Sequence, residues 1–370
     1  MTIFFIKLFK SIFAPLLLFC YMVYLGFVLN LHQLNSEHKR LLIGEPYNEN
    51  YIKFYKWNRD IDSISIIAIG SSRVLQFKSE FFNESFFNLG YLVGTPKQTL
   101  ELIKHKNLKN KTLIISLDQW AFNSNWSKES SNFVTPENPS FFRSSFSNNR
   151  LIDVLKFKIR PNFKNICNSD LLKIGAGATM ALDGVINDGS YYYGKTYHGL
   201  LNDNKELIGE DYLFKNTKDR IKNGNRRFEY GFFCDPKALN DFQDLVQYNK
   251  KMGNTVYYFF PPFAPSVQRE LSNPNYHYIQ DAIKKVSKIS ENHNVKFFDF
   301  TYFPSADSEY IDGFHGGSHL YYELLKNMGL QTRDCNFLNQ YETVNDSALS
   351  LERKCFFTSS KTNQNHKDSN

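Results

Sequence analysis

Residues 63–77 read SISIIAIGSSRVLQF. The first eight, 63–70, are apolar and β-branched and end in glycine, which is typical of a buried strand that enters a tight turn. The next seven, 71–77, are expected to begin a helix, with Ser71 or Ser72 as its N-cap. A strand that leads directly into a helix is the repeating unit of parallel α/β sheets.

The same alternation continues along the chain. Further strands are predicted at FFNLGYL (86–92), TLIISLDQW (112–120), NTVYYFFPP (254–262) and VKFFDFT (295–301). Helices are predicted, from the spacing of apolar residues and from terminal glycines, at 96–106, 238–253, 278–293 and 318–329. The sequence therefore predicts an α/β fold, a three-layer sandwich around a mainly parallel sheet.

Composition excludes several classes of protein. The chain has 370 residues, a mean hydropathy of -0.43, 16% aromatic residues and only five cysteines. These values argue against a polytopic membrane protein, a fully disordered chain and a disulfide-built miniprotein. The net charge of +7 is spread along the chain, so we expect no nucleic-acid partner.

The N-terminus departs from this average. Ser11 to Leu31 contain no charged residue, and as a helix they would extend about 32 Å, enough to cross a bilayer core. A cleaved signal peptide is the alternative, but no A-x-A cleavage pattern follows the run. We therefore predict an uncleaved membrane anchor over 1–32. Because Lys7 and Lys10 precede it, we expect a single-pass protein of the bacterial cytoplasmic (inner) membrane whose bulk lies on the periplasmic or extracellular side.

The rest of the chain divides by composition. Residues 33–60 are polar and predict a stalk, and 61–357 predict the extracytoplasmic folded domain. That domain contains an insertion at about 124–235, rich in Asn, Ser, Phe and Tyr, whose role the sequence does not assign. The polar tail 358–370 is expected to be disordered.

Reactive groups are expected where parallel strands end, because these ends meet at one edge of the sheet. Ser72 follows the first strand, and Asp312 and His315 stand three residues apart near the C-terminus. A D-x-x-H turn lets the carboxylate bind one imidazole nitrogen and leaves the other free to activate a serine. The structural alternatives are a helix cap for the serine and an ordinary turn for D-x-x-H.

These segments together resemble a known family. IIAIGSSRVLQF, FFNLGYLVGT, LIISLDQW and YIDGFHGGSHLYYELL are similar to the ordered blocks of the SGNH (GDSL-like) hydrolase superfamily. The closer resemblance is to its membrane-anchored bacterial branch, which includes the teichoic acid D-alanyl transfer and alginate O-acetylation proteins. It covers roughly 63–120 and 238–330, and implies Ser72 as nucleophile, His315 as general base and Asp312 as its orienting group.

The resemblance also implies an oxyanion hole made by the N–H groups of Gly90 and Ser72. The third block departs from the family pattern. The superfamily often has an Asn directly after this strand, whereas here Asp118 follows the strand and Asn123 comes five residues after Asp118. Asp118 is expected to border the pocket or to cap a turn. Arg73 is expected to bind an anionic sugar or phosphate, or to form a surface salt bridge.

Two rivals remain for the catalytic roles. Ser71 is the alternative nucleophile, and His319 is the alternative base, although its place at a helix start favours a structural or binding role. Ser72 is preferred because it occupies the serine position of the G-D-S motif.

The function expected from the resemblance is O-acyl transfer. The protein would be an O-acyltransferase, most simply an O-acetyltransferase, that modifies a cell-surface or secreted polysaccharide through a serine acyl-enzyme. A multi-spanning membrane O-acyltransferase would be the partner that supplies the acyl group, and no cofactor or metal is expected. The alternatives are a carbohydrate esterase or deacetylase with the same triad and a non-catalytic assembly protein on the same fold.

Overall fold

The computed structural model describes three long stretches and several short pieces of the chain. The long stretches are 61–126, 183–201 and 204–333, and the short pieces are 7, 11–13, 15–17, 41–44, 53, 172–174 and 177–178. Most of the predicted membrane span, most of the stalk and the whole of the tail 358–370 lie outside these residues. Among the residues described, no helix combines the length and the apolar character needed to cross a bilayer.

The chain forms two compact units. The larger one comprises Trp57–Thr135, Asp188–Ser190 and Lys195–Asn370, and the smaller one comprises Met1–Lys56, Pro136–Asn187 and Tyr191–Gly194. Each unit has a β-sheet of its own within the described residues. The predicted catalytic residues all belong to the larger unit.

The described part of the larger unit is built on a five-stranded sheet in the order β3-β2-β4-β8-β9, with every neighbouring pair parallel. Its strands are β3 (Phe86–Gly90), β2 (Ile66–Gly70), β4 (Thr112–Ser116), β8 (Thr255–Phe260) and β9 (Lys296–Asp299). The predicted α/β class with a parallel sheet is thereby confirmed. Gly70 and Gly90 lie side by side in register where β2 and β3 end.

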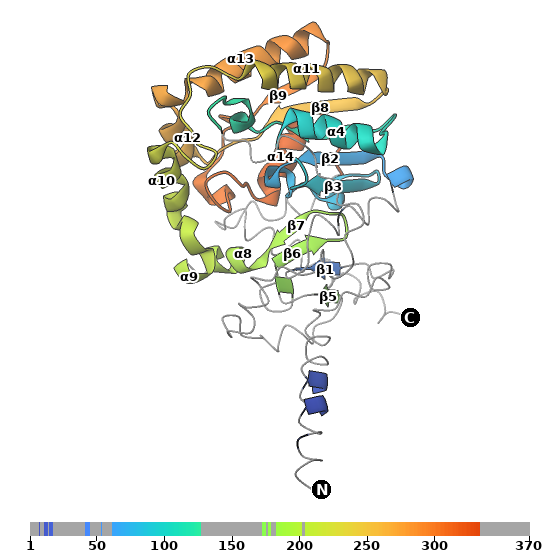
Figure 1. Ribbon diagram of the computed structural model, residues 1–370, viewed down its shortest axis with the longest axis vertical. Coiled ribbons are helices and arrows are strands. Elements are labelled where there is room, and N and C mark those ends of the chain that lie inside the picture. The colour runs from blue at the N-terminus through green and yellow to red at the C-terminus, as the bar shows by residue number, and fades with distance from the viewer. Residues whose placement is uncertain are drawn as a thin grey trace, which may run out of the picture. The chain divides into compact units, whose positions relative to one another are not determined.

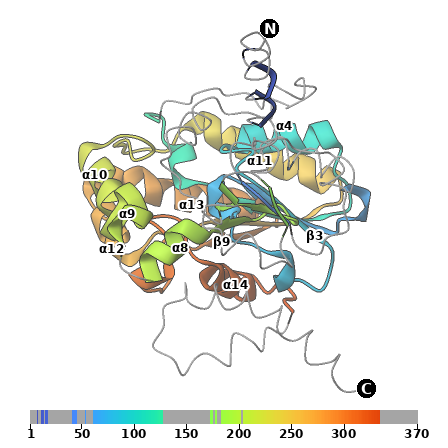
Figure 2. The same ribbon diagram turned by 90° about the horizontal axis from the view of Figure 1, so that it is seen from below.

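Helices cover both faces of this sheet, as Figures 1 and 2 show. One face carries α4 (Pro96–Lys106), α11 (Pro236–Lys251) and α13 (His277–Asn292), and the other carries α14 (Ser318–Asn327). Side chains alternate along a strand, so Ala68 and Ile114 pack toward Leu324 of α14 in one apolar cluster. On the opposite face Phe242 of α11 contacts Tyr258 of β8, with ring centroids 5.2 Å apart. This arrangement is compatible with the predicted three-layer sandwich.

Local signals fix where the helices begin and end. Thr95 caps α4 by accepting a hydrogen bond from the Gln98 N–H, and Asn107 ends the helix in the left-handed conformation with φ of 49°. Asp235 caps α11 in the same way, ahead of Pro236. The segment after Ser71, in contrast, forms only a short 3-10 turn, η2 (Ser72–Val74), where a helix was expected.

The smaller unit has a four-stranded sheet among its described residues, in the order β5-β1-β6-β7. Its strands are β5 (Leu172–Ile174), β1 (Leu41–Ile43), β6 (Asp183–Ile186) and β7 (Tyr191–Tyr193). The strand β1 comes from the predicted stalk, whereas the other three come from the predicted insertion. Residues 41–43 are therefore part of a folded sheet, which the sequence analysis did not anticipate.

Candidate active site

The turn after β2 sets the position of two adjacent serines. A Cβ atom at Gly70 would come within 2.8 Å of the Ser116 Cβ, so the strand end can pass β4 this closely only as glycine. The Ser71 hydroxyl caps the turn by accepting a hydrogen bond from the Arg73 N–H at 3.2 Å. Ser72 is then the first residue of η2, where backbone N–H groups have no acceptor within the helix itself.

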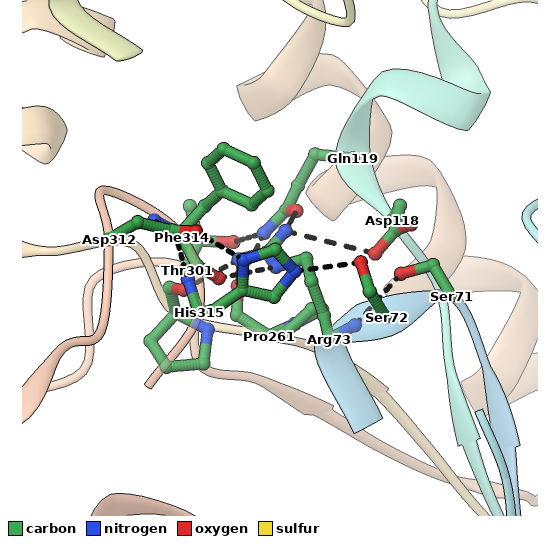
Figure 3. Close-up of polar contacts among 11 residues, drawn as sticks. Ser71, Ser72, Arg73, Asp118, Gln119, Pro261, Thr301, Asp312, Phe314 and His315 are labelled. Carbon is green, nitrogen blue, oxygen red and sulfur yellow. Dashed lines mark hydrogen bonds and ion pairs between the residues drawn. The ribbon is translucent and has the colours of Figure 1, made fainter. Parts of the chain in front are cut away.

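Ser72, His315 and Asp312 form one hydrogen-bonded chain, drawn in Figure 3. The Ser72 Oγ lies 2.7 Å from the Nε2 of His315, and the Nδ1 of His315 lies 2.6 Å from the Oδ2 of Asp312. The second carboxylate oxygen, Oδ1, accepts the N–H groups of Phe314 at 3.0 Å and His315 at 2.8 Å. The D-x-x-H segment is thus a turn closed by its own aspartate. The structure brings together the three residues that the sequence analysis singled out for catalysis.

Electrostatics keep Asp312 ionised. Burial raises its pKa, but the neighbouring His315 and the two backbone N–H donors outweigh this, and the net pKa lies below the ordinary aspartate value. An ionised carboxylate only accepts hydrogen bonds, so it selects the imidazole tautomer that carries its proton on Nδ1. The Nε2 lone pair of His315 then faces the Ser72 hydroxyl, which is the arrangement a general base needs.

Arg73 lies inside the protein, with its side chain fully buried. All three guanidinium nitrogens donate to the chain: Nε to the Phe314 carbonyl, Nη1 to the Gln119 Oε1, and Nη2 to the carbonyls of Pro261 and Pro262. The group also lies over the Phe263 ring, 4.3 Å from its centroid. These contacts join the ends of several strands to the D-x-x-H turn (Figure 3), and they use the donors expected to bind an anionic substrate.

Asp118 is the buried charge nearest to that guanidinium. Its Oδ1 lies 3.8 Å from the Arg73 Nη1, and both side chains are almost completely buried. Burial raises its pKa, and Arg73 and the Ser71 hydroxyl offset this only in part. Burial also lowers the pKa of Arg73, against the opposing influence of Asp118. Asp118 therefore borders the turn at Ser71 and Ser72 from inside the protein.

Gly90, the expected second oxyanion donor, lies beside the nucleophile turn. Its N–H donates to the Asn88 Oδ1 at 2.8 Å, so this donor is already engaged. The Nδ2 of Asn88 donates to the carbonyls of Val74 at 2.7 Å and Phe77 at 2.9 Å. A fully buried asparagine thus ties β3 to the segment that follows Ser72. The Val74 carbonyl also accepts the Phe77 N–H at 3.1 Å, so the bonds in this segment are those of tight turns and not those of the expected helix.

Asn123 and His319 lie apart from the hydrogen-bonded triad. The Asn123 Nδ2 donates to the Glu229 carbonyl at 2.6 Å, and its Oδ1 accepts the Asn125 N–H at 3.0 Å. His319 faces Glu309, with their nearest side-chain atoms 3.6 Å apart. Asn123 thus fixes a loop of the insertion, and His315 is the histidine placed against Ser72.

Several residues that shape the site were not predicted from the sequence. Gln119 joins Arg73 to the Pro261 carbonyl and to the Thr301 hydroxyl. Asp211, from the unassigned insertion, accepts the Gly313 N–H at 3.0 Å. The position of Gln119 at a strand end was a usable signal, whereas nothing in the local sequence marks Asp211. In the described parts of the chain, no cluster of three or more His, Cys, Asp and Glu side chains is arranged to hold a metal ion.

Two comparisons with known proteins were negative. No protein-family model matches the chain, and no curated protein matches it.

Proposed function

We propose that this protein is a serine-dependent O-acyltransferase of SGNH type, most simply an O-acetyltransferase, that modifies a polysaccharide outside the cytoplasmic membrane. The observation that carries the proposal is the chain of hydrogen bonds from Ser72 through His315 to Asp312. A serine hydroxyl, a base and an orienting carboxylate in this order are what covalent acyl transfer requires.

In the first half-reaction the Ser72 Oγ attacks the carbonyl carbon of the acyl donor. The new Oγ–carbon bond forms, the proton passes to the His315 Nε2, and the bond to the departing carrier breaks as His315 returns that proton to it. Asp312 holds the imidazole and stabilises its positive charge. The Ser72 N–H, at the start of η2, is the donor we assign to the oxyanion, because Gly90 donates to Asn88.

In the second half-reaction a sugar hydroxyl gives its proton to His315 and attacks the acyl carbon, which releases Ser72. Water in place of the sugar would make the same site an esterase. The apolar run 11–31 supports a transferase held at the membrane, where a multi-spanning O-acyltransferase would deliver the acyl group.

The test is the ester-bound acyl content of the surface polysaccharide in a strain that carries Ser72→Ala. We expect acylation to be lost at normal protein level. A Ser71→Ala strain is the comparison, because that change removes the neighbouring hydroxyl, whose cap is worth about 1 kcal/mol, and leaves the three side chains of the triad in place. Unchanged acylation in the Ser72→Ala strain would exclude the transferase, and increased acylation would identify an esterase.

A further inference from the structure

Two charged side chains from outside the triad hydrogen-bond to the backbone between Asp312 and His315. Asp211 accepts the Gly313 N–H through its Oδ2 at 3.0 Å. Arg73 donates to the Phe314 carbonyl through its Nε at 3.1 Å. We propose that Asp211 and Arg73 form a clamp, the Asp211–Arg73 clamp, which positions the D-x-x-H turn against the nucleophile. The inference that the clamp serves catalysis rests on the proposed function, but the clamp itself does not.

The Asp211 half of the clamp comes from the insertion, the part of the chain without an assigned role. Asp211 lies in the 3-10 segment η6 (Gly209–Phe214), just before α10 (Lys215–Asn223). Its Oδ1 accepts the Thr217 N–H at 2.7 Å, and its Oδ2 also accepts the Thr217 hydroxyl at 2.8 Å. One carboxylate therefore accepts an N–H of the first turn of α10, which has no acceptor within the helix, and also holds the catalytic turn, so the position of the helix and that of the turn depend on each other.

Close packing requires the glycine in this turn. A Cβ atom at Gly313 would come within 2.6 to 2.8 Å of three side-chain atoms of Thr217. The backbone of the turn is thus pressed directly against α10, which explains the Gly of the D-G-F-H segment. Residues of the insertion therefore pack directly against the catalytic turn.

The Arg73 half of the clamp comes from the residue next to the nucleophile. Because Arg73 directly follows Ser72, its hydrogen bond to Phe314 links the two catalytic segments across 241 positions of sequence. Its remaining donors are fixed by Gln119, Pro261 and Pro262, so the guanidinium cannot shift without breaking several bonds. A planar guanidinium fixes the directions of its N–H donors, so it orients the groups that it binds, which a lysine ammonium does not do.

The turn also has hydrogen bonds of its own. Asp312 accepts the N–H groups of Phe314 and His315, and the His315 carbonyl accepts the Ile311 N–H at 2.7 Å. Internal bonds therefore shape the turn, while bonds from outside locate it: those from the Asp211 and Arg73 side chains and one backbone bond, from the Ala264 N–H to the Gly313 carbonyl at 3.1 Å. Losing the clamp should leave the turn intact but displace it from Ser72, and a shift of about 1 Å in a catalytic group lowers a rate on the order of 100-fold.

A simple helix cap is the competing explanation for Asp211, and two measurements on the full-length protein separate them. The variants are Asp211→Ala and Arg73→Lys, with Asp219→Ala, an exposed aspartate of the same helix, as the matched control. The first measurement is hydrogen–deuterium exchange of the peptide spanning 311–317. We expect faster exchange there in both clamp variants and wild-type exchange in Asp219→Ala. Unchanged exchange over 311–317 would overturn the clamp, whatever the protein catalyses.

The second measurement is the rate constant at which a fluorophosphonate labels Ser72, counted per folded molecule. In this reaction the Ser72 Oγ–phosphorus bond forms, the phosphorus–fluorine bond breaks, and His315 takes the serine proton. We expect the rate constant to fall at least about 10-fold in Asp211→Ala and Arg73→Lys and to stay at the wild-type value in Asp219→Ala. A helix cap alone would reduce the folded fraction and leave this rate constant unchanged, which would refute the positioning role. A wild-type protein that does not label at all contradicts the proposed function, while the exchange result still decides the clamp.

Discussion

The substitution Asn88→Asp tests how the structure holds the nucleophile turn. Asn88 is fully buried, and its Nδ2 donates to the carbonyls of Val74 and Phe77. Aspartate has the same shape and volume, so the change creates no cavity. It replaces a double donor by an oxygen that faces two carbonyl oxygens, while the acceptor of the Gly90 N–H is kept.

The cost follows from these contacts. The Phe77 carbonyl loses its donor, whereas the Val74 carbonyl keeps the Phe77 N–H at 3.1 Å. A buried carbonyl left without its donor costs about 1–3 kcal/mol, so the fold should lose at least that much before any repulsion is counted. The total stability of a domain is about 5–15 kcal/mol, so this is a large fraction of it. At about 2–4 °C per kcal/mol for a unit of this size, the melting temperature should fall by at least about 2 °C.

The assay is thermal unfolding of the full-length protein, followed by tryptophan fluorescence, because Trp120 lies buried near the site. Asn240→Asp is the matched control, since Asn240 is an exposed residue of α11 and its substitution should change stability by no more than about 0.5 kcal/mol. If Asn88→Asp melts at the same temperature as the control, the assigned hydrogen bonds do not support the turn.

Three further substitutions or reactions test separate contacts. In Gly90→Ala the new Cβ would lie 2.7 Å from the Val74 Cγ2, so we expect the free energy of unfolding to fall by about 1–3 kcal/mol, measured by thermal melting. An unchanged melting temperature would show that the contact relaxes freely. The pKa of Asp312 is lowered in the folded protein, so its ionised side chain stabilises the fold above the ordinary pKa value of 3.8, and this contribution is lost as pH falls through the folded pKa. The melting temperatures of wild type and Asp312→Asn should therefore converge at low pH. A difference between them that stays constant with pH would contradict the lowered pKa. Burial raises the pKa of the Cys234 thiol to about 11, so iodoacetamide at about pH 8 should alkylate this position only on unfolding, and fast modification of the folded protein, located by peptide mapping, would refute this.

Much of the parallel sheet was predictable because its signals are local. The helix expected at 96–106 has those bounds in the structure, since Thr95, Pro96 and Asn107 are capping and terminating residues in the immediate sequence. Short apolar runs likewise marked β2, β4 and β8. The strand β1 was not predictable in this way: it has three residues, and its partners β5 and β6 lie more than a hundred residues away in sequence.

In the candidate site, too, some features were predictable from the sequence and others were not. The convergence of Ser72 with Asp312 and His315 follows from where parallel strands end, which the order of elements already indicates. The burial of Arg73 does not, because its acceptors are backbone carbonyls at Pro261 and Phe314, and any residue type supplies such a group. Sequence patterns record side chains, so they indicated Ser72 and His315 but not the backbone bonds that place them.

The identity of the nucleophile is the central claim, and peptide mapping after fluorophosphonate labelling tests it most directly. The structure places the Ser72 Oγ 2.7 Å from the His315 Nε2, while the Ser71 hydroxyl caps η2. We predict a single adduct on Ser72, kept in Ser71→Ala and lost in Ser72→Ala and His315→Ala. An adduct on Ser71, or labelling of Ser72 that does not depend on His315, would contradict the account.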